Sequence, residues 1–545
     1  MTYCGHCWNR VGPHRSGKLG PGGIPHEKTD QAIADKLRAT LEACSDDLEQ
    51  QELFRMDENT AWFGVVKDES EDSIFYDYGR YADIMTEISQ VTNPRQRQGA
   101  QHNRFPGLVS FVGETGAGKS TLVKVLIELS ESGEGFQTPI VGSNKHQDVP
   151  TSGDVHLYTD PETYLSETPI FYADCEGLAG GEREPKGARS KLLNRMAGNN
   201  KGAQRSHTTK SFEQSLVFVL KNPRVIENVI EKLIEWAAAA LEMSSNQPVL
   251  PHAVIALNAS ELNIDQEQWD TKISTSWLMN SVQSSLTSNV LFKKHTQIWR
   301  NRGRQINTVE DLLLSYYSTV TVVRIPANGR PKLMKDQVEK LYGQIMKSTE
   351  AARKSKRDLR MLLDGGELQT YLQFAFDHFS SNLDQAFDFV QASFIYNPIP
   401  SDFAGNILKL AVGMMERWEH ELDGKAIFTE LSHMVASCIM LDSARNKTRG
   451  SAELIFPEYV DSCDNALEDF CDRYWPCEYV MKVKTKRGKE VGGRCVNVRS
   501  GHGSKGHQFK NGKVIAVGNY ESSFSAESFQ EVFRYLVTSR GAKKN

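Results

Sequence analysis

The sequence lacks the long apolar run that a membrane-spanning helix needs, because its best stretch, WAAAALEM from Trp236, is far too short. It also lacks the apolar core of a secretory signal near its N-terminus, a C-terminal prenylation box and the glycine that N-myristoylation requires. Its nine cysteines are scattered and do not form the framework of a secreted, disulfide-rich domain. We therefore expect an intracellular, cytoplasmic protein, and the sequence gives no indication of membrane association.

The chain carries no strong excess of charge of either sign. Its formal net charge is −5 over 545 residues, which gives no electrostatic reason to expect nucleic-acid binding. A chain this long exceeds what one hydrophobic core usually organises. The shifts in composition predict five segments, which are a flexible arm at 1–27, a mixed segment at 28–100, a P-loop domain at 101–352, a helical domain at 353–460 and a Cys/His-rich segment at 461–545.

Short, largely apolar runs alternate with helical patterns between about residues 108 and 350. The runs are Leu108–Val112, Ile170–Ala173, Leu216–Leu220, Ala253–Leu257 and Val320–Ile325, and the helical patterns lie at 119–131, 223–243, 266–300 and 334–350. Uninterrupted apolar runs are typical of parallel strands buried on both faces. The sequence therefore predicts an α/β fold, with a mostly parallel sheet and helices on both faces. Past Lys356 the pattern predicts helices, including one at 370–394, and it then predicts a strand-like run at Val514–Val517 before a last helix at 525–538.

The stretch FVGETGAGKST, residues 111–121, follows the first apolar run and matches the pattern G-x-x-x-x-G-K-[ST]. Backbone amides of such a loop surround phosphate oxygens, and the N-terminus of the following helix adds a positive dipole. We expect Lys119 to contact the β- and γ-phosphates and Ser120 to hold Mg²⁺. The nucleotide-binding residues predicted in this loop are Gly113, Glu114, Thr115, Gly116, Ala117, Gly118, Lys119, Ser120 and Thr121.

Two elements downstream also fit a nucleotide-binding site. Asp174 ends an apolar run and opens the spacing D-x-x-G, so we expect Asp174 to hold Mg²⁺ and the Gly177 amide to contact the γ-phosphate. Between the loop and Asp174 stands PTSGDVHLY, where a switch hydroxyl would close over Mg²⁺. Thr151 and Ser152 are both candidates for that hydroxyl, and a plain hairpin turn is the alternative.

Base recognition is expected after the run Ala253–Leu257, where a guanine-specific N-K-x-D element would stand. The sequence there is Asn258-Ala259-Ser260-Glu261, so the asparagine is in place while alanine replaces lysine and glutamate replaces aspartate. Glu261 would accept two hydrogen bonds from the guanine edge if the loop retreats by about one methylene. In the alternative, Asn258 and Ser260 cap the next helix. We expect guanine in preference to adenine.

With these residues assembled, the region from about 105 to 350 resembles the GTPase domain of the dynamin superfamily, in the style of guanylate-binding proteins and atlastins. The motif from Asp174 to Leu178, DCEGL, is similar to the D-T-E-G-L of that family, and Thr151 followed by Gly153 matches its switch I. The chain also resembles uncharacterised fungal P-loop proteins. The resemblance implies a large GTPase that acts as a switch or an assembly-coupled mechanoenzyme, with Mg²⁺ as cofactor and a nucleotide-dependent homodimer. It covers under half of the chain, and this loop lacks the arginine of guanylate-binding proteins.

No glutamine follows Gly177, so the attacking water needs another orienting group, such as switch I backbone or Glu176. We expect Lys119, Thr151 and Glu176 to carry the chemistry, with slow basal hydrolysis that a dimer or a partner stimulates. Arg183 and Arg189 are the candidate groups for that stimulation. Two alternatives stay open: an ATPase in which Glu176 is the polarising base, and a nucleotide-binding scaffold with negligible hydrolysis.

Thiol and imidazole side chains crowd the C-terminal segment. Cys477, Cys495, His502 and His507 have the chemistry of a Cys2His2 zinc site, although their intervals do not match a standard finger. Buried cysteines beside surface histidines are the alternative. A weaker metal candidate is Cys4-x-x-Cys7 near His14.

Overall fold

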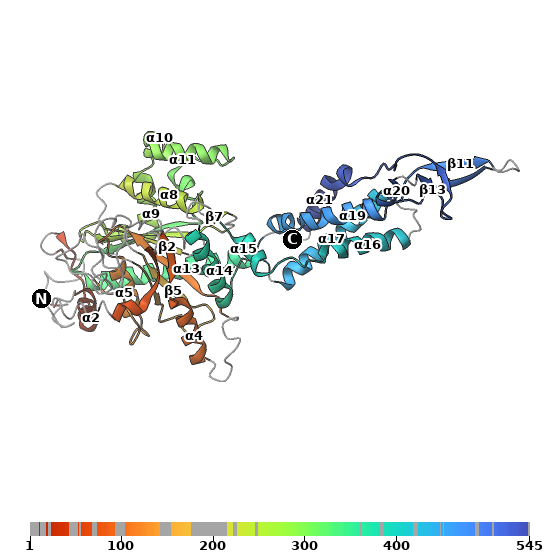
Figure 1. Ribbon diagram of the computed structural model, residues 1–545. Helices are drawn as coiled ribbons and strands as arrows, with labels where there is room; N and C mark the ends of the chain where they lie inside the picture. The colour runs from red at the N-terminus through yellow and green to blue at the C-terminus, as the bar shows by residue number, and fades with distance from the viewer. Residues whose placement is uncertain are drawn as a thin grey trace. The chain divides into compact units, whose positions relative to one another are not determined.

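The computed structural model describes residues 10, 18–19, 23–42, 53, 56–67, 73–92, 104–141, 154–175, 215–221, 226–242, 244–245, 249–359, 361–381, 386–417, 423–446, 448, 450, 452–484, 490–503 and 506–542. The chain divides into two compact units, Met1–Asp388 and Phe389–Asn545 (Figure 1). Within the described ranges, none of the helices combines the length and apolar character that crossing a bilayer requires.

The first unit is built on an eight-stranded mixed sheet with the order β2-β1-β4-β5-β3-β6-β8-β9. The strands are β1 (Ala61–Lys67), β2 (Ser73–Asp77), β3 (Gly107–Gly113), β4 (Val155–Thr159), β5 (Ile170–Asp174), β6 (Ser215–Lys221), β8 (His252–Ser260) and β9 (Val320–Pro326). The five strands from β5 to β9 in this order run parallel, whereas β2, β1 and β4 extend the sheet by antiparallel pairing. This confirms the predicted parallel strands and adds an antiparallel edge that the sequence analysis did not foresee.

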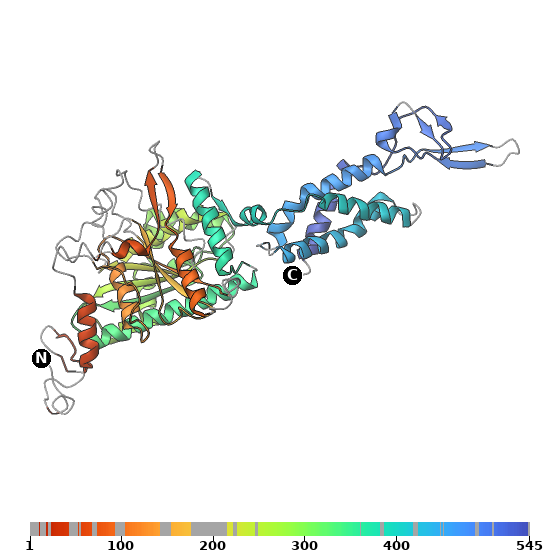
Figure 2. The same ribbon diagram turned by 60° about the horizontal axis from the view of Figure 1, so that its bottom comes forward.

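Helices surround this sheet. They are α2 (Gln31–Leu41), η3 (Glu58–Thr60), α4 (Arg80–Thr92), α5 (Lys119–Leu129), α8 (Ile226–Glu242), η6 (Gln266–Trp269), α9 (Thr271–Ser281), α10 (Ser285–Ser288), α11 (Val290–Asn301), α12 (Val309–Leu313), α13 (Pro331–Asp358) and α14 (Gly365–Ser381). A small parallel pair, β7 (Ser244–Ser245) with β10 (Phe387–Asp388), completes the unit. Figure 1 shows α8, α10 and α11 together on one side, and Figure 2 shows the long green helix α13 running along the sheet.

Both faces of the parallel strands are buried, which explains why their sequences are mostly apolar. Alternate residues such as Val109 and Phe111 on β3, or Val217 and Val219 on β6, share one core cluster with α2, α5 and α13. The residues on the opposite face of these strands, such as Leu108 and Val112 on β3, are equally buried. A polar residue on either face would therefore lose its hydration, and this keeps the strands apolar.

The strand order places the loop after β3 at a special point of the sheet. The neighbours of β3 are β5 on one side and β6 on the other, so the connections that follow β3 lead away from it in opposite directions. Open α/β sheets bind ligands outside the carboxyl ends of their strands at such a switch point. The Gly113–Ser120 loop lies there.

Two of the expected long helices are interrupted. The pattern predicted over 266–300 contains η6, α9, α10 and α11, because Asp270 and Asn289 each accept hydrogen bonds from the first amides of a new helix. The pattern predicted over 370–394 ends with α14 at Ser381, and the chain then forms β10 before the next helix begins at Phe389. Helical spacing of apolar residues continued across both interruptions, so periodicity alone missed them.

The second unit contains a helical bundle. Its elements are α15 (Phe389–Tyr396), α16 (Phe403–Arg417), α17 (Gly424–Arg445), α18 (Ala452–Ile455), η7 (Phe456–Tyr459), α19 (Val460–Arg473) and α21 (Ala526–Ala542). At the centre of its core, the Phe428 ring contacts the rings of Phe470 and Phe533 at centroid distances of 5.2 and 5.0 Å. The predicted helical region is present, and its last helix spans a few more residues than the expected 525–538.

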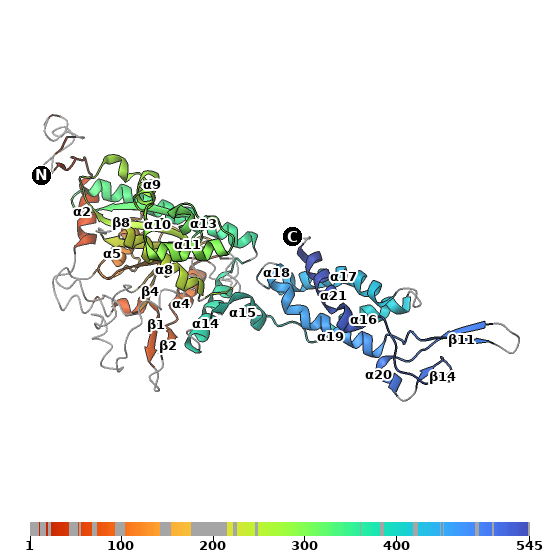
Figure 3. The same cartoon turned by 90° about the horizontal axis from the view of Figure 1, so that it is seen from above.

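A segment of small strands is inserted between the last two long helices of this bundle. It contains the antiparallel pair β11 (Val480–Lys484) and β12 (Glu490–Arg494), the turn α20 (Arg499–His502), and the pair β13 (His507–Gln508) and β14 (Val514–Ala516). Figure 3 shows β11, α20 and β14 together beyond one end of the helices of this unit. Since α21 returns to pack on α17 and α19 after the insertion, both ends of the inserted segment are anchored on one bundle.

Candidate nucleotide-binding and metal sites

The loop between β3 and α5 depends on glycine at both of its ends. Gly113 has φ +149°, and a Cβ there would lie 2.1 Å from the carbonyl oxygen of Val219 on β6. Gly118, the residue before α5, has φ +93° and ψ 27°. An L-side chain rarely adopts such a backbone. The glycines therefore let the loop turn closely over the sheet and enter the helix.

Lys119 begins α5 and points into the loop. The side chain is buried, and its Nζ donates hydrogen bonds to the carbonyl oxygens of Gly113 at 3.2 Å and Glu114 at 3.1 Å. A buried ammonium without a full set of acceptors is costly, so the loop carbonyls hold this charge in place. The positive charge thus lies inside the turn of the loop, where an anion at the carboxyl edge of the sheet would meet it.

Asp174 lies at the carboxyl end of β5, beside β3 in the sheet. Burial raises the pKa of its carboxyl, and the Lys119 charge and a hydrogen bond from the Ser120 hydroxyl lower it. Its Oδ1 is buried without a hydrogen-bond partner in the described part of the chain. A buried carboxylate oxygen with no partner beside a serine hydroxyl is a donor set that fits Mg²⁺, which prefers oxygen ligands. These two residues can hold such an ion.

Asn258 ties the β8 edge to the loop. Its Nδ2 donates to the carbonyl oxygen of Ala117 at 2.8 Å, while its Oδ1 accepts from the Ala259 amide at 2.9 Å. A Cβ on Gly118 would lie 2.4 Å from the same Nδ2. Asn258 does not cap a helix, and neither does Ser260, because both belong to β8 and the next helical turn begins at Gln266. The helix-cap alternative is therefore wrong.

Glu261, the expected partner of the guanine edge, follows β8 directly and is exposed. It stands in the connection between β8 and η6, at the same edge of the sheet as Asn258. A base contact from Glu261 stays a prediction. Ala259, inside β8, has φ +55°, an uncommon conformation for a residue with a side chain, and the register of β8 with β9 shifts between Leu257 and Ser260.

An ion pair joins the loop to α8. The Lys232 Nζ lies against the Glu114 carboxylate, and both side chains are partly exposed. Glutamate in a phosphate-binding loop would repel an anion, and the lysine offsets that repulsion. Nothing in the local pattern of either residue pointed to this pair, because 118 positions separate them in the sequence.

A buried polar cluster lies next to Asp174. His156 on β4 stands opposite Asp174 in the strand register, and its Nδ1 lies 2.8 Å from the Thr60 hydroxyl. The Tyr158 hydroxyl donates to Asp57 at 2.8 Å, and burial raises the pKa of this tyrosine. The cluster connects the segment before β1 to the strand beside Asp174. Sequence reasoning missed it, since each residue alone reads as an ordinary strand or turn position.

Several predicted residues lie outside the described residues. These are Thr151, Ser152, Glu176, Gly177, Arg183 and Arg189 around the expected switches, together with Cys4, Cys7 and His14. Their roles stay predictions. The described loop, Asp174 and Asn258, in contrast, meet at one edge of the sheet as expected.

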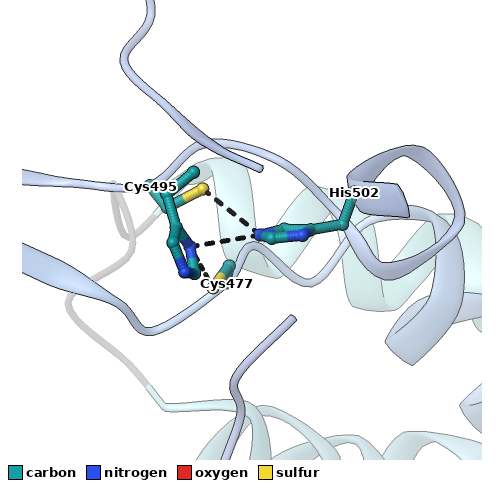
Figure 4. Close-up of side chains that lie close together, drawn as sticks. Cys477, Cys495 and His502 are labelled. Atoms are coloured by element: carbon teal, nitrogen blue, oxygen red, sulfur yellow. Dashed lines mark hydrogen bonds between the residues drawn. The ribbon is translucent and has the colours of Figure 1, made fainter. Parts of the chain in front are cut away.

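The structure brings Cys477, Cys495, His502 and His507 together, and we call these four residues the Cys2His2 cluster. One ligand atom of each lies within 4.8 Å of all the others, and the four side chains are buried. Figure 4 shows Cys477, Cys495 and His502 converging on one point. Thiolate sulfur and imidazole nitrogen are metal ligands, so the cluster can hold a metal ion.

The fold and these sites define a mostly parallel α/β unit with a glycine-rich loop at the switch point, followed by a helical unit. No protein-family model matches the chain, and no curated protein matches it either. Among solved structures, a GTP-binding protein from the hyperthermophilic archaeon Sulfolobus solfataricus in complex with GDP is 14% identical, over 57% of this chain and 71% of that chain, with a TM-score of 0.20. A glycine-to-proline variant of SsGBP is 16% identical, over 57% and 69%, also with a TM-score of 0.20. Likenesses of this size carry no argument about what this chain does.

Proposed function

We propose that the first unit binds a nucleoside triphosphate, with GTP preferred, and hydrolyses it with Mg²⁺. The observation that carries the proposal is the geometry of the loop after β3: a buried Lys119 ammonium held on the carbonyl oxygens of Gly113 and Glu114, at the switch point of a mostly parallel sheet. A triphosphate can compete for this charge because its oxygens are stronger acceptors than neutral carbonyls.

Asp174 and Ser120 would hold Mg²⁺ in this function. The unpartnered Oδ1 of Asp174 supports this assignment, as does the hydrogen bond between the two side chains. The ion, when bound, neutralises charge on the phosphates. The residues of this chain bind and orient the triphosphate: loop amides and Lys119 fix the phosphates, and Asn258 holds the loop against the β8 edge where the base would lie.

The preference for guanine and the kinship with dynamin-type large GTPases are the finer parts of the proposal. Asn258 stands where the guanine-reading element of that family begins, and its contact with Ala117 supports that placement. An ATPase that uses Glu176 as base, or a scaffold that binds nucleotide without turnover, would keep the same loop. They differ from our proposal in base preference and in phosphate release, respectively.

The test compares binding of labelled GTP and ATP to the full chain and to two lysine variants of α5. Lys119→Ala should weaken triphosphate binding by at least about 100-fold, because it removes the two expected contacts of the ammonium with the β- and γ-phosphates. Each charge-assisted contact of this kind is worth about 1.5–3 kcal/mol. Lys124→Ala is the matched control, since that lysine lies further along the same helix and pairs with Glu128. Equal binding by both variants would refute the proposal, and tighter ATP binding would favour the ATPase.

Turnover separates the enzyme from the scaffold. We propose slow basal hydrolysis that a second copy of the chain stimulates, on the ground that no glutamine follows Gly177. The rate per molecule should then rise with protein concentration. A constant rate would remove the dimer from the proposal, and tight binding without phosphate release would leave a scaffold.

For the Cys2His2 cluster we propose Zn²⁺ as the bound ion. Two thiol and two imidazole donors make a set of four, which is the number that a tetrahedral structural zinc takes. Metal analysis of the purified chain should find about one zinc per chain.

A further inference from the structure

The inserted segment between α19 and α21 has an unusual interior. Side chains are described for residues 478–481, 492–503, 506–514 and 516–523 of this segment, and the buried ones among them belong to three members of the Cys2His2 cluster, namely Cys495, His502 and His507. The fourth member, Cys477, directly precedes this range. Several apolar side chains of the segment are instead exposed, including Val480, Val514 and Val517. Among the side chains described in this segment, the metal-binding residues are thus more deeply buried than the apolar ones.

The four ligand atoms already have the spacing of a tetrahedral site. The Cys477 sulfur lies 3.6 Å from the His507 Nδ1, the Cys495 sulfur lies 3.9 Å from the His502 Nε2, and the two ring nitrogens are 3.2 Å apart. Bonds of about 2.3 Å to sulfur and 2.0–2.1 Å to nitrogen separate the ligands of tetrahedral zinc by about 3.3–3.8 Å. The three observed distances, from 3.2 to 3.9 Å, extend slightly beyond this interval at both ends, and small shifts of the ligands would fit them around a single ion.

Backbone amides are directed at both sulfurs. The amides of Asn497 and Gln508 donate to the Cys495 sulfur at 3.4 Å each, and the amide of Glu521 donates to the Cys477 sulfur at 3.4 Å. Such donors compensate the negative charge of a buried thiolate. They also come from three separate stretches of the insertion, so the sulfurs connect its beginning, its middle and its end.

The site is closed to solvent. Tyr479 stacks on the His507 ring at a centroid distance of 3.9 Å, and Gly518 leaves room for that ring, since a Cβ there would lie 2.5 Å from its Nε2. Four buried protein ligands leave no open position for a substrate or a reactive water, which is the arrangement of structural rather than catalytic zinc.

We propose that Zn²⁺ is the core of residues 477–521: this segment folds around the ion, whereas the bundle of α16, α17, α19 and α21 keeps its structure without it. The proposal rests on the zinc assignment above and is independent of nucleotide binding. Short antiparallel pairs of two to five residues do not hold together alone in water. The bundle, in contrast, is held by its own aromatic and aliphatic core. Metal binding in small domains of this kind supplies the free energy of folding.

The experiment removes zinc from the full chain with a chelator and follows amide hydrogen exchange. Exchange in residues 490–521, including the amides of Asn497, Gln508 and Glu521, should become at least about 100-fold faster, while α17 and α19 keep their protection. One equivalent of added Zn²⁺ should restore the protection. Cys477→Ser should reproduce the loss, and Cys438→Ser, which changes an exposed cysteine of α17, should not.

The outcomes distinguish the two levels of the proposal. If zinc is present and its removal leaves exchange in the insertion unchanged, the ion is bound but is not the core, and the folding proposal is wrong. If no zinc is found and the insertion is nevertheless protected, both the ion and its role are wrong. If α17 and α19 lose protection together with the insertion, the separation from the bundle is wrong. Nucleotide binding, measured on the same samples, should not change in any of these cases.

Discussion

Gly118→Ala tests the geometry of the nucleotide loop most directly. The residue ends the loop at φ +93°, and a methyl group there would lie 2.4 Å from the Nδ2 of Asn258. The substitution therefore does two things at once. It places a side chain in a left-handed conformation, and it displaces the asparagine that holds the carbonyl oxygen of Ala117.

The expected size follows from these two effects. The left-handed conformation costs an L-residue about 1–2 kcal/mol, and loss of the Asn258–Ala117 hydrogen bond costs about 0.5–1.5 kcal/mol. Together they amount to about 1.5–3.5 kcal/mol, which corresponds to triphosphate binding on the order of 10- to 400-fold weaker. In the background of Asn258→Ala the clash is absent, so Gly118→Ala should then cost only the conformational part, about 1–2 kcal/mol.

The assay is titration of a fluorescent GTP analogue into the four chains of this double-mutant cycle. Gly135→Ala is the control, because Gly135 also has a positive φ of +87° but a Cβ there would have nothing within 4 Å. It should leave nucleotide affinity unchanged. Wild-type affinity of Gly118→Ala, or strict additivity with Asn258→Ala, would refute the view that the loop is held by this contact.

Three further outcomes follow from particular residues. Gly424→Ala should destabilise the second unit by about 1–3 kcal/mol, because its Cβ would lie 2.2 Å from the Phe524 ring. Gly413→Ala, whose Cβ would lie in open space beside α16, should stabilise the unit by about 0.5–1 kcal/mol. Urea denaturation midpoints that shift in the same direction for both variants would contradict this prediction. Burial raises the pKa of the Asp160 carboxyl in the folded chain, so this carboxyl contributes its full stabilisation below the unfolded pKa of about 3.9 and loses it as pH rises through the folded pKa. Over that window, the free energy of unfolding of the wild-type chain should fall relative to that of an Asp160→Asn chain. A constant difference between the two chains would contradict the prediction. Ser120→Ala should raise the Mg²⁺ concentration needed for half-maximal GTP binding by about 10-fold or more, and an unchanged midpoint in the metal titration would remove Ser120 from the metal site.

The parallel strands could be predicted because burial on both faces leaves a direct record in the sequence. Each such strand contains a largely apolar run, and all five predicted runs lie within strands of the sheet. The antiparallel edge left a weaker record. In β4 the polar residues His156 and Thr159 are buried by partners from distant parts of the chain, so the strand does not read as apolar. The interruptions inside 266–300 were signalled by Asp270 and Asn289, whose capping role is visible in the sequence only if each is tested as a helix start.

The candidate nucleotide site also contains some residues that the sequence could predict and others that it could not. The loop and Asp174 are local motifs, so their residue types and spacing suffice to propose their roles. Asn258 was singled out by its type alone, and its contact with Ala117 depends on β8 lying two strands away from β3 in the sheet. The Glu114–Lys232 pair and the polar cluster around Thr60 depend on similar long-range proximity, which no local pattern records.

The two candidate sites differ in the interactions that hold their residues in place. At the loop after β3, a large hydrophobic core fixes the backbone first, and the site is a consequence of where the strands end. In the insertion we expect the reverse order, because the buried side chains described there are the ligands themselves and the strands are only two to five residues long. A nucleotide should therefore bind to a loop that is already formed, and it should raise the free energy of unfolding only because it binds the folded state. Zinc, on the same reasoning, should determine whether its binding site exists at all.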